Sequence, residues 1–552
     1  MNDENLFKEI WVNEVIKCLN TDDRIIVSQP IKNLLNAIDM GDSCISIDAD
    51  IIKYFGVLLS DDAKASIFKV EQSKLFLSRH YSLEKRLAEE IKRVVSSKNS
   101  YRINSDKYEN LLNDPYQKKA LLTSLNSKIS LIIGGAGTGK TYTLARIVSA
   151  INDSIEGIKI AFAAPTGKAA QRMQEALKNA FSDEILSEYL KGDLLNANPI
   201  TIHRLIGLSE SGKAQFGKNR KLPYDVIIID ESSMIDLSVA VNLFEAIKDS
   251  AIVIMLGDAN QLPSVAVGNV FSDIQRTKLL SPSVVELKNS RRFLQDAKIG
   301  RLANYIQENT TKRTVKDFEN NIVSNSNLRN IELNSVQDDF IQFKLINNNF
   351  DEKDLDTIVS GFNDFFSKIA SYKQNPTINQ VYEISKSFET YRILTSIKNG
   401  KFGSNTINRY ILERIGKVEN TDFIGKAILI SENNYSLGLS NGDIGICVYS
   451  PDLNGELSYY FPSLDKYIAS SLIPYNTNLA YAMTIHKSQG SEFDHVAIII
   501  DDGERMLNKQ LFYTAVTRAK KVISLLATEA ALESCINNNS TRQSGLVEKI
   551  DC

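Results

Sequence analysis

Short runs of apolar, β-branched residues alternate with amphipathic stretches from about residue 115 onward. Four such runs lie in the first half of this region, each bounded by glycine or an acidic residue, at 130–135, 158–165, 224–231 and 250–258. Runs without polar alternation fit parallel strands covered on both faces. Their alternation with amphipathic helices predicts β–α–β crossovers and therefore an α/β lobe on a parallel sheet.

Three later runs repeat this pattern at 391–397, 495–501 and 521–527, and they predict a second parallel-sheet lobe. The interval 401–477 interrupts this second set with turns and alternating residues. Asn441-Gly442 in this interval is a typical hairpin-turn dipeptide. We therefore expect a small β-rich insert within the second lobe.

The N-terminal region predicts a helical module without a chemical motif, ending in an amphipathic helix over 75–97. Inside the first lobe, the polar and basic excursion 207–222 predicts a β-hairpin or loop, whereas 300–390 carries little pattern. The chain is therefore expected to divide into an N-terminal domain, a first lobe, a split second lobe and an insert, over 1–108, 109–293, 294–400 with 478–552, and 401–477.

The composition of the chain argues against several classes of protein. The chain has 43% hydrophobic and 24% charged residues, ordinary values for a globular protein. No apolar run approaches the roughly 18 residues of a membrane span, and the N-terminus lacks a secretory pattern, so we expect a cytoplasmic protein with no membrane partner. Five scattered cysteines without a C-x-x-C pair, and four histidines, argue against disulfide, zinc or iron–sulfur frameworks and a metal-dependent nuclease site. A net charge of −3 means that nucleic acid, if bound, sits in a local groove.

A phosphate-binding loop follows the first apolar run. Gly134-Gly135-Ala136-Gly137-Thr138-Gly139-Lys140-Thr141 matches G-x-x-x-x-G-K-[ST] between a strand and a helix. Glycines let backbone N–H groups approach phosphate oxygens, and the helix N-terminus favours anions. Lys140 is expected to neutralise the terminal phosphates and Thr141 to hold Mg²⁺. The expected cofactors are therefore ATP and Mg²⁺.

An acidic pair, Asp230-Glu231, closes the run 224–231. We assign Asp230 to the Mg²⁺ ion and Glu231 to the general base that polarises the attacking water. Loop and acids together predict a nucleoside triphosphatase. Small-molecule kinases, transport ATPases and motors all share these elements, so residues farther along must decide between them.

Those residues resemble the motifs of superfamily 1 helicases. The stretch 114–117 (DPYQ) is similar to the Q-motif, and later stretches resemble motifs Ia, Ib, III, IV, V and VI at 164–170, 201–205, 256–263, 290–293, 482–493 and 513–519. The resemblance implies two RecA-like lobes with ATP between them. It implies that Gln117 binds adenine, that Gln261 senses the γ-phosphate, and that Arg518 is an arginine finger. Arg292, or its neighbour Arg291, would reach the triphosphate from the second lobe.

The same resemblance implies contacts with single-stranded DNA at Pro165, Thr166, Lys168, Thr201, His203, Arg204, Thr484, His486 and Lys487. Turns that place N–H groups, threonine hydroxyls and lysines beyond strand ends suit phosphate contact. His203 taken alone would be interpreted as a structural histidine. Gln489 and Glu492 are expected to link the lobes.

The amino-acid sequences of several motifs resemble those of the RecD branch of superfamily 1B, over about 110–550. Examples are APTGKAAQRM, TIHRLIG and GDANQLPSVAVGNVFSDI. The stretches 75–88 and 541–546 also resemble that branch, although 541–546 alone fits a solvated tail. The resemblance implies 5′–3′ movement on single-stranded DNA from duplex ends, with 207–222 as a candidate strand-separating pin.

It further implies the alpha subunit of exodeoxyribonuclease V, in a heterotrimer with RecB-like and RecC-like subunits that repairs double-strand breaks. The N-terminal domain would then dock partners, and nuclease activity would reside in a partner. Stand-alone relatives carry a much longer N-terminal extension, so the roughly 110 residues here favour the complex-bound type.

Three alternatives stay open: a stand-alone superfamily 1B helicase, a DNA-independent P-loop ATPase switch, and a structural subunit with a vestigial site. The switch would need the phosphate loop and the acids but not motifs Ia, III, V and VI. Intact Lys140, Glu231 and Arg518 argue against the vestigial site. Stimulation of ATP hydrolysis by single-stranded DNA separates the motor from the switch.

Overall fold

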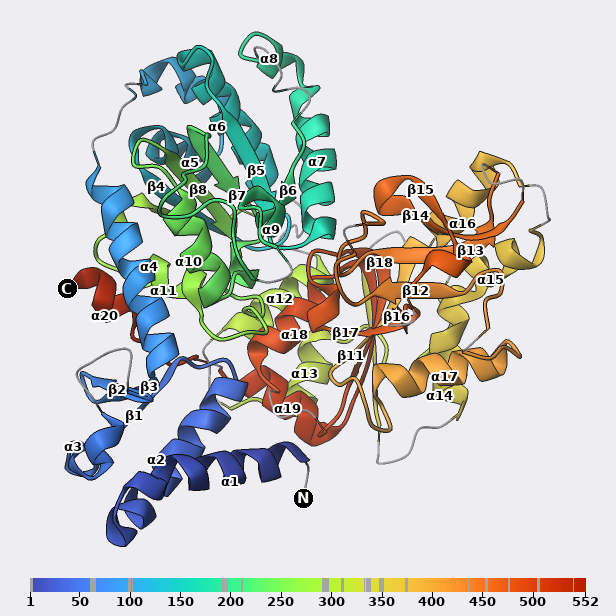
Figure 1. Cartoon of the computed structure of the whole chain (residues 1–552). Coiled ribbons are helices and arrows are strands. Elements are labelled where there is room, and N and C mark those ends of the chain that lie inside the picture. The colour runs from blue at the N-terminus through green and yellow to red at the C-terminus, as the bar shows by residue number, and fades with distance from the viewer. Residues whose placement is uncertain are drawn as a thin grey trace.

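Two parallel-sheet lobes lie side by side, with a β-rich insert on the second lobe and a mixed N-terminal region below the first (Figure 1). The computed structural model describes the chain except residues 1–2, 60–65, 98–100, 102, 191–193, 195–196, 210–211, 290–296, 309–311, 332, 334–338, 347–351, 373–375, 420, 435, 452–454, 475–476, 504–506 and 540. No helix in this described part is both long and apolar enough to cross a bilayer.

Lobe 1 is built on a six-stranded sheet in the order β6-β5-β7-β8-β4-β9, and every pairing in it is parallel. Its strands are β4 (Ile129–Gly134), β5 (Ile160–Ala164), β6 (Ile200–Thr201), β7 (Val226–Ile229), β8 (Ile252–Gly257) and β9 (Val284–Leu287). Its helices are α5 (Pro115–Asn126), α6 (Lys140–Ser154), α7 (Gly167–Phe181), α8 (Glu184–Ser187), α9 (Ile202–Leu205), α10 (Leu237–Ala246) and α11 (Val270–Arg276).

Burial explains why these strands are apolar at every position. On β7, Val226 and Ile228 join the core on one face of the sheet, while Ile227 and Ile229 join the core on the other. Successive strand residues point to opposite faces, so a strand with helices on both sides needs a continuous apolar run. The four predicted runs are confirmed as β4, β5, β7 and β8.

Lobe 2 carries a five-stranded parallel sheet in the order β10-β19-β18-β11-β17. Its strands are β10 (Phe340–Leu345), β11 (Tyr391–Thr395), β17 (Ala482–Thr484), β18 (Phe493–Ile500) and β19 (Ala519–Ala527). Its helices are α12 (Lys298–Gln307), α13 (Val315–Ile322), α14 (Glu352–Val359), α15 (Asn363–Ala370), α16 (Ile378–Thr390), α17 (Ser404–Arg414), α18 (Lys509–Val516) and α19 (Glu529–Asn537). The runs at 391–397, 495–501 and 521–527 are confirmed as strands, and the little-patterned 300–390 supplies helices and the edge strand β10.

The insert is an antiparallel five-stranded sheet in the order β15-β14-β13-β12-β16, with an apolar cluster of its own. It comprises β12 (Ala427–Ile430), β13 (Ile444–Tyr449), β14 (Leu457–Phe461), β15 (Lys466–Ala469) and β16 (Thr477–Leu479). Asn441-Gly442 occupies the centre of a turn closed by the bond from Asp443 N–H to the Ser440 carbonyl. Gly442 has φ 94°, the backbone that favours glycine at such a turn.

The N-terminal region is more mixed than a purely helical module. It holds α1 (Asp3–Val15), α2 (Thr21–Asp39), α3 (Ala49–Ile52) and α4 (Ser78–Ser96), and also an antiparallel sheet of β1 (Cys44–Ser46), β2 (Phe68–Glu71) and β3 (Lys74–Leu77). The helix expected over 75–97 therefore starts at Ser78, and the residues just before it form β3. The apolar face of α4 packs on α10, in the same core as lobe 1.

The C-terminal segment crosses back from lobe 2 to lobe 1. After α19 in lobe 2, the short helix α20 (Leu546–Asp551) lies against α4 and α11, and Leu546 and Ile550 enter the core of lobe 1 (Figure 1). The interpretation of 541–546 as a solvated tail is therefore wrong.

Candidate active site between the lobes

The phosphate-binding loop connects β4 to α6 at the carboxyl edge of the lobe 1 sheet. Gly137 and Gly139 have φ values of 76° and 82°, a backbone that glycine adopts without strain. A side chain on Gly139 would also lie 2.6 Å from the Gln117 amide nitrogen. The Lys140 ammonium donates to the Gly134 carbonyl at 2.6 Å and to the Gly135 carbonyl at 3.0 Å, so its charge lies inside the loop. Loop, ammonium and the N-terminus of α6 form an anion-binding concavity.

Gln117 is placed beside this loop by a capped helix. The Asp114 carboxylate accepts from the N–H groups of Tyr116 and Gln117, and Pro115 fills the first turn of α5, as the sequence predicts. The Gln117 amide nitrogen donates to the Thr138 carbonyl at 3.2 Å. Its amide oxygen is buried, with no hydrogen-bond partner among the described residues. A buried amide oxygen without a protein donor is available to accept a hydrogen bond from a bound ligand.

The acidic pair lies directly after β7. Burial first, and then the charge of Glu231, raise the pKa of Asp230 to about 6, while Lys140 and Arg172 oppose the shift. Glu231 is a non-glycine residue in the left-handed region, at φ 50° and ψ 40°. Such a backbone costs on the order of 1–3 kcal/mol and is concentrated at functional sites. The Thr141 hydroxyl and the Asp230 carboxylate are hard oxygen ligands of the kind Mg²⁺ prefers, and a cation would offset the crowding of negative charge.

Asp258, just beyond β8, organises the loop that carries Gln261. Its carboxylate accepts from the Asn260 N–H at 3.0 Å, the Gln261 amide at 3.1 Å and the Tyr513 hydroxyl at 3.0 Å. Burial raises the pKa of Asp258. The Gln261 oxygen is buried and lacks a hydrogen-bond partner in the part of the chain that the structure describes.

Arg518 brings lobe 2 into the same site. Its side chain is 3% exposed and is held by the carbonyls of Thr514 and Ser491, at 3.0 and 3.2 Å. Burial lowers the pKa of Arg518, and the negative charges of Glu231, Glu492 and Asp258 act against that shift. The charges of two lobe 1 acids, Glu231 and Asp258, therefore act on this lobe 2 guanidinium.

Further contacts join the lobes around Gln261. The Leu262 N–H donates to the Thr514 hydroxyl at 2.8 Å, and the Gln489 amide donates to the Leu262 carbonyl at 2.7 Å. Glu492 forms an ion pair at 2.7 Å with Arg172 of α7. The expectation that Gln489 and Glu492 link the lobes is confirmed. Arg172 was missed, although it stands four residues after Lys168 on α7, a spacing that places both on one helix face.

The residues predicted to contact DNA follow the strand ends. Thr166 and Thr201 cap α7 and α9, accepting from the N–H groups three residues on. Burial lowers the pKa of Lys168 to about 8 and that of His486 to about 4. His203 is half-buried, and burial lowers its pKa. Arg204 and Lys487 are exposed, and Pro165 and Thr484 are half-buried. These DNA contacts stay predictions, and Arg291 and Arg292 lie outside the described residues.

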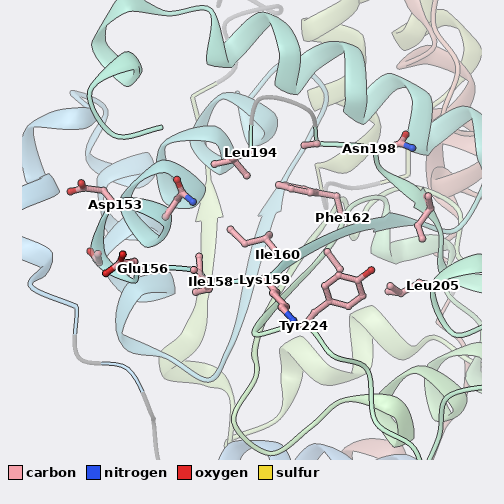
Figure 2. A pocket seen from close by; sticks show the side chains of 16 residues that line it. Asp153, Glu156, Ile158, Lys159, Ile160, Phe162, Leu194, Asn198, Leu205 and Tyr224 are labelled. Atoms are coloured by element: carbon pink, nitrogen blue, oxygen red, sulfur yellow. The ribbon is translucent and has the colours of Figure 1, made fainter. Parts of the chain in front are cut away.

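A pocket of about 940 Å³ lies beside β5, and its lining contains no residue of the phosphate-binding loop or the acidic pair (Figure 2). Ile158, Ile160 and Phe162 line it near the amino end of β5, and Tyr224 faces it just before β7. The phosphate loop and the acids lie at the opposite, carboxyl edge of this sheet. In parallel α/β sheets ligands bind beyond the carboxyl ends of the strands, so this pocket is not the nucleotide site.

Fold and site together define a composite nucleotide-hydrolysing centre, shared by two RecA-like lobes. An AAA domain model matches residues 117–267, and a UvrD-like helicase C-terminal domain model matches residues 479–526. RecBCD enzyme subunit RecD of Buchnera aphidicola subsp. Schizaphis graminum is 31% identical, over 83% of this chain and 81% of its own length. The same subunit of Buchnera aphidicola subsp. Acyrthosiphon pisum is 32% identical, over 78% of this chain and 75% of its own length.

This chain belongs to the RecD family of superfamily 1 helicases. A solved structure of Bacteroides Pif1 bound to single-stranded DNA is also similar, at 17% identity and a TM-score of 0.39, over 75% of this chain and 92% of that one.

Proposed function

We propose that this chain is an ATP-driven motor that moves 5′ to 3′ on single-stranded DNA, as the RecD-type subunit of a helicase–nuclease complex. The observation that carries the proposal is the position of Arg518 at the contact between the lobes. Its guanidinium donates to the Thr514 carbonyl at 3.0 Å, and the Thr514 hydroxyl accepts from the Leu262 N–H of lobe 1 at 2.8 Å. A catalytic centre assembled from two bodies is what couples hydrolysis to movement between them.

In this proposal each side chain has a distinct task on ATP. Lys140 and the N–H groups of the phosphate loop bind the phosphates, and Gln117 binds adenine. Glu231 orients the attacking water and accepts its proton, while Arg518 stabilises the charge that develops on the transferred phosphoryl group. Mg²⁺, held by Thr141 and Asp230, would supply charge neutralisation at the phosphate oxygens.

Movement follows from the division of the site. ATP bound to lobe 1 attracts Arg518 and draws lobe 2 inward, and loss of the γ-phosphate weakens that attraction. Leu262 is bonded to Gln489 and Thr514, so a shift of lobe 2 pulls on the loop that carries Gln261. The predicted DNA residues of motifs Ia, Ib and V would then grip the strand alternately. The excursion 207–222 remains the candidate pin; Lys218 in it faces Glu90 and Glu245.

The names of relatives and one exposed surface support a proposal about the partners of this chain. Relatives that cover most of this chain are named RecBCD enzyme subunits. On α1, Leu6, Phe7 and Ile10 are 48%, 68% and 53% exposed. Exposed apolar side chains clustered on one helix favour a protein contact. We propose that α1 docks RecB-like or RecC-like subunits and that the complex acts at duplex DNA ends in the cytoplasm.

The test measures ATP hydrolysis with and without single-stranded DNA, and unwinding of duplexes with a 5′ or a 3′ overhang. We expect strong stimulation by DNA, unwinding from the 5′ overhang only, and loss of both in Lys140→Ala at an unchanged melting temperature. Hydrolysis indifferent to DNA would instead establish the ATPase switch. Expression beside RecB-like and RecC-like subunits separates the complex-bound motor from a stand-alone helicase.

A further inference from the structure

The loop Pro263–Gly268, which follows Gln261, is held by residues from three distant parts of the chain. Gly268 N–H donates to the Gly41 carbonyl at 2.9 Å, and Leu237 N–H donates to the Val267 carbonyl at 3.1 Å. The Arg542 guanidinium donates to the carbonyls of Ala266 at 3.0 Å and Gly268 at 2.8 Å. Among the described residues, Arg542 is the side chain that binds two carbonyls of this loop.

The position of Arg542 is tightly specified. Gly41, at φ 88°, lies directly under the guanidinium, and a Cβ at this glycine would collide with it. Asp42 and Asp273 balance the positive charge, while burial lowers the pKa of Arg542 to about 10. A guanidinium packed against Gly41 and bonded to two carbonyls has lost most of its rotamer freedom, as a positioning group requires.

The segment that carries Arg542 is itself anchored, which fixes where the guanidinium lies. We name residues 541–552 the C-terminal strap. Glu84 is 1% exposed and accepts from the Gly545 N–H at 3.2 Å and the Lys549 ammonium at 3.0 Å. Gln543 exchanges bonds with Asp42, Ser43 and Ser46 of the N-terminal region. The residues that these contacts join lie 461 to 501 positions apart in the chain.

Arg542 also interacts electrostatically with one of the residues predicted to contact DNA. Its charge acts on His486, which follows β17 in the motif V stretch. At its other end, the loop is bonded through Leu262 to Gln489 and Thr514 of lobe 2. The loop is therefore fastened by lobe 2 beside Gln261 and by the strap beyond it, with Val265 between them 74% exposed.

We propose that Arg542 is a positioning residue that holds the Pro263–Gly268 loop in register, so that DNA binding at lobe 2 is transmitted to Gln261. The inference rests on the proposed DNA-stimulated ATPase. Without Arg542, lobe 2 would still move Leu262. The far end of the loop would then be free to shift as well, so the movement of Leu262 would not displace Gln261. The loss then falls on stimulation by DNA and not on hydrolysis without DNA.

The experiment compares Arg542→Ala with Gln543→Ala, its neighbour in the strap, which loses one hydrogen bond to Ser46 but none to the loop. For Arg542→Ala we expect DNA-stimulated kcat to fall about tenfold, the scale of lost hydrogen bonds to a charged group, with DNA-free kcat and the KM for ATP within about twofold of wild type. Gln543→Ala is expected to keep wild-type stimulation, and Arg542→Lys to recover part of it.

Wild-type stimulation in folded Arg542→Ala would overturn the proposal, and so would an equal loss in Gln543→Ala. If Arg542→Ala does not fold, Arg542→Gln takes its place: reduced stimulation supports the proposal, and full stimulation overturns it. Wild-type protein whose ATPase ignores DNA would instead sink the proposed function, so the two failures are distinguishable.

Discussion

At the scale of single residues, Arg518 is buried, and burial disfavours its positive charge. It lies 3% exposed, and the hydrogen bonds that hold it come from carbonyl and hydroxyl oxygens of its own lobe. Removing an arginine finger lowers phosphoryl-transfer rates by about 10³–10⁵. We expect Arg518→Ala to lower DNA-stimulated kcat by about 10³ or more, with a much smaller change in the KM for ATP. Steady-state kinetics check this, and Lys520→Ala, an exposed cation two residues away, is the control.

Burial of the Asp230 carboxylate makes the stability of the fold depend on pH. Its folded-state pKa of about 6 lies above the ordinary value of 3.8, so folding binds extra protons between these values. Its ionised form therefore destabilises the fold fully above about pH 6, and this penalty disappears as pH falls toward 4. We predict that Asp230→Asn is more stable than wild type at pH 8, that the difference shrinks by pH 4.5, and that ATPase activity is lost. Urea unfolding at both pH values measures this, and an equal difference at both would contradict it.

At the scale of elements, the contact between the Gln261 loop and α18 is the joint between the lobes. Thr514 is fully buried, and its hydroxyl accepts from the Leu262 N–H at 2.8 Å. Thr514→Val keeps the shape but leaves that N–H without its acceptor, at a cost of about 1–3 kcal/mol. We expect DNA-stimulated ATPase to fall several-fold more than DNA-free ATPase.

Thr395→Val is the matched control for that joint. Thr395 is also fully buried in lobe 2, but its hydroxyl donates to the Ile397 carbonyl within the same lobe. The free energy of unfolding, from urea titration, should fall in both variants, whereas the loss of coupling should follow Thr514→Val alone. Equal loss in Thr395→Val would mean that general destabilisation, and not the joint, lowers the activity.

The same scale shows what the sequence can predict. Strands covered on both faces need long apolar runs, so runs of apolar residues in the sequence predict β4, β7, β8 and β18. The spacing of glycine, lysine and threonine predicts the phosphate-binding loop. The sheet at Cys44–Leu77 was missed, because strands of three or four residues are too short to show a period and β3 runs directly into α4. The strap was missed for another reason: its contacts with Glu84 and Gly268 are set by tertiary packing and leave no local pattern.

At the scale of the whole molecule, the chain has surfaces its own fold does not cover. The α1 surface is separate from the composite active site, since α1 packs on α2 within the N-terminal core (Figure 1). Partner docking through α1 and hydrolysis between the lobes should therefore be separable by mutation. We predict that Phe7→Ser combined with Ile10→Ser keeps DNA-stimulated ATPase and the melting temperature, because exposed side chains contribute little to folding.

That same double variant should fail to co-purify with RecB-like and RecC-like subunits expressed beside it, because apolar anchors at the centre of an interface carry most of its binding energy. The matched control is Ile378→Ser with Tyr382→Ser on α16 of lobe 2, a second exposed apolar pair at helical spacing, 67% and 52% exposed. Co-purification should survive the control. If both pairs release the partners, or neither does, α1 is not the docking surface; if only the α16 pair releases them, the partners bind lobe 2 instead.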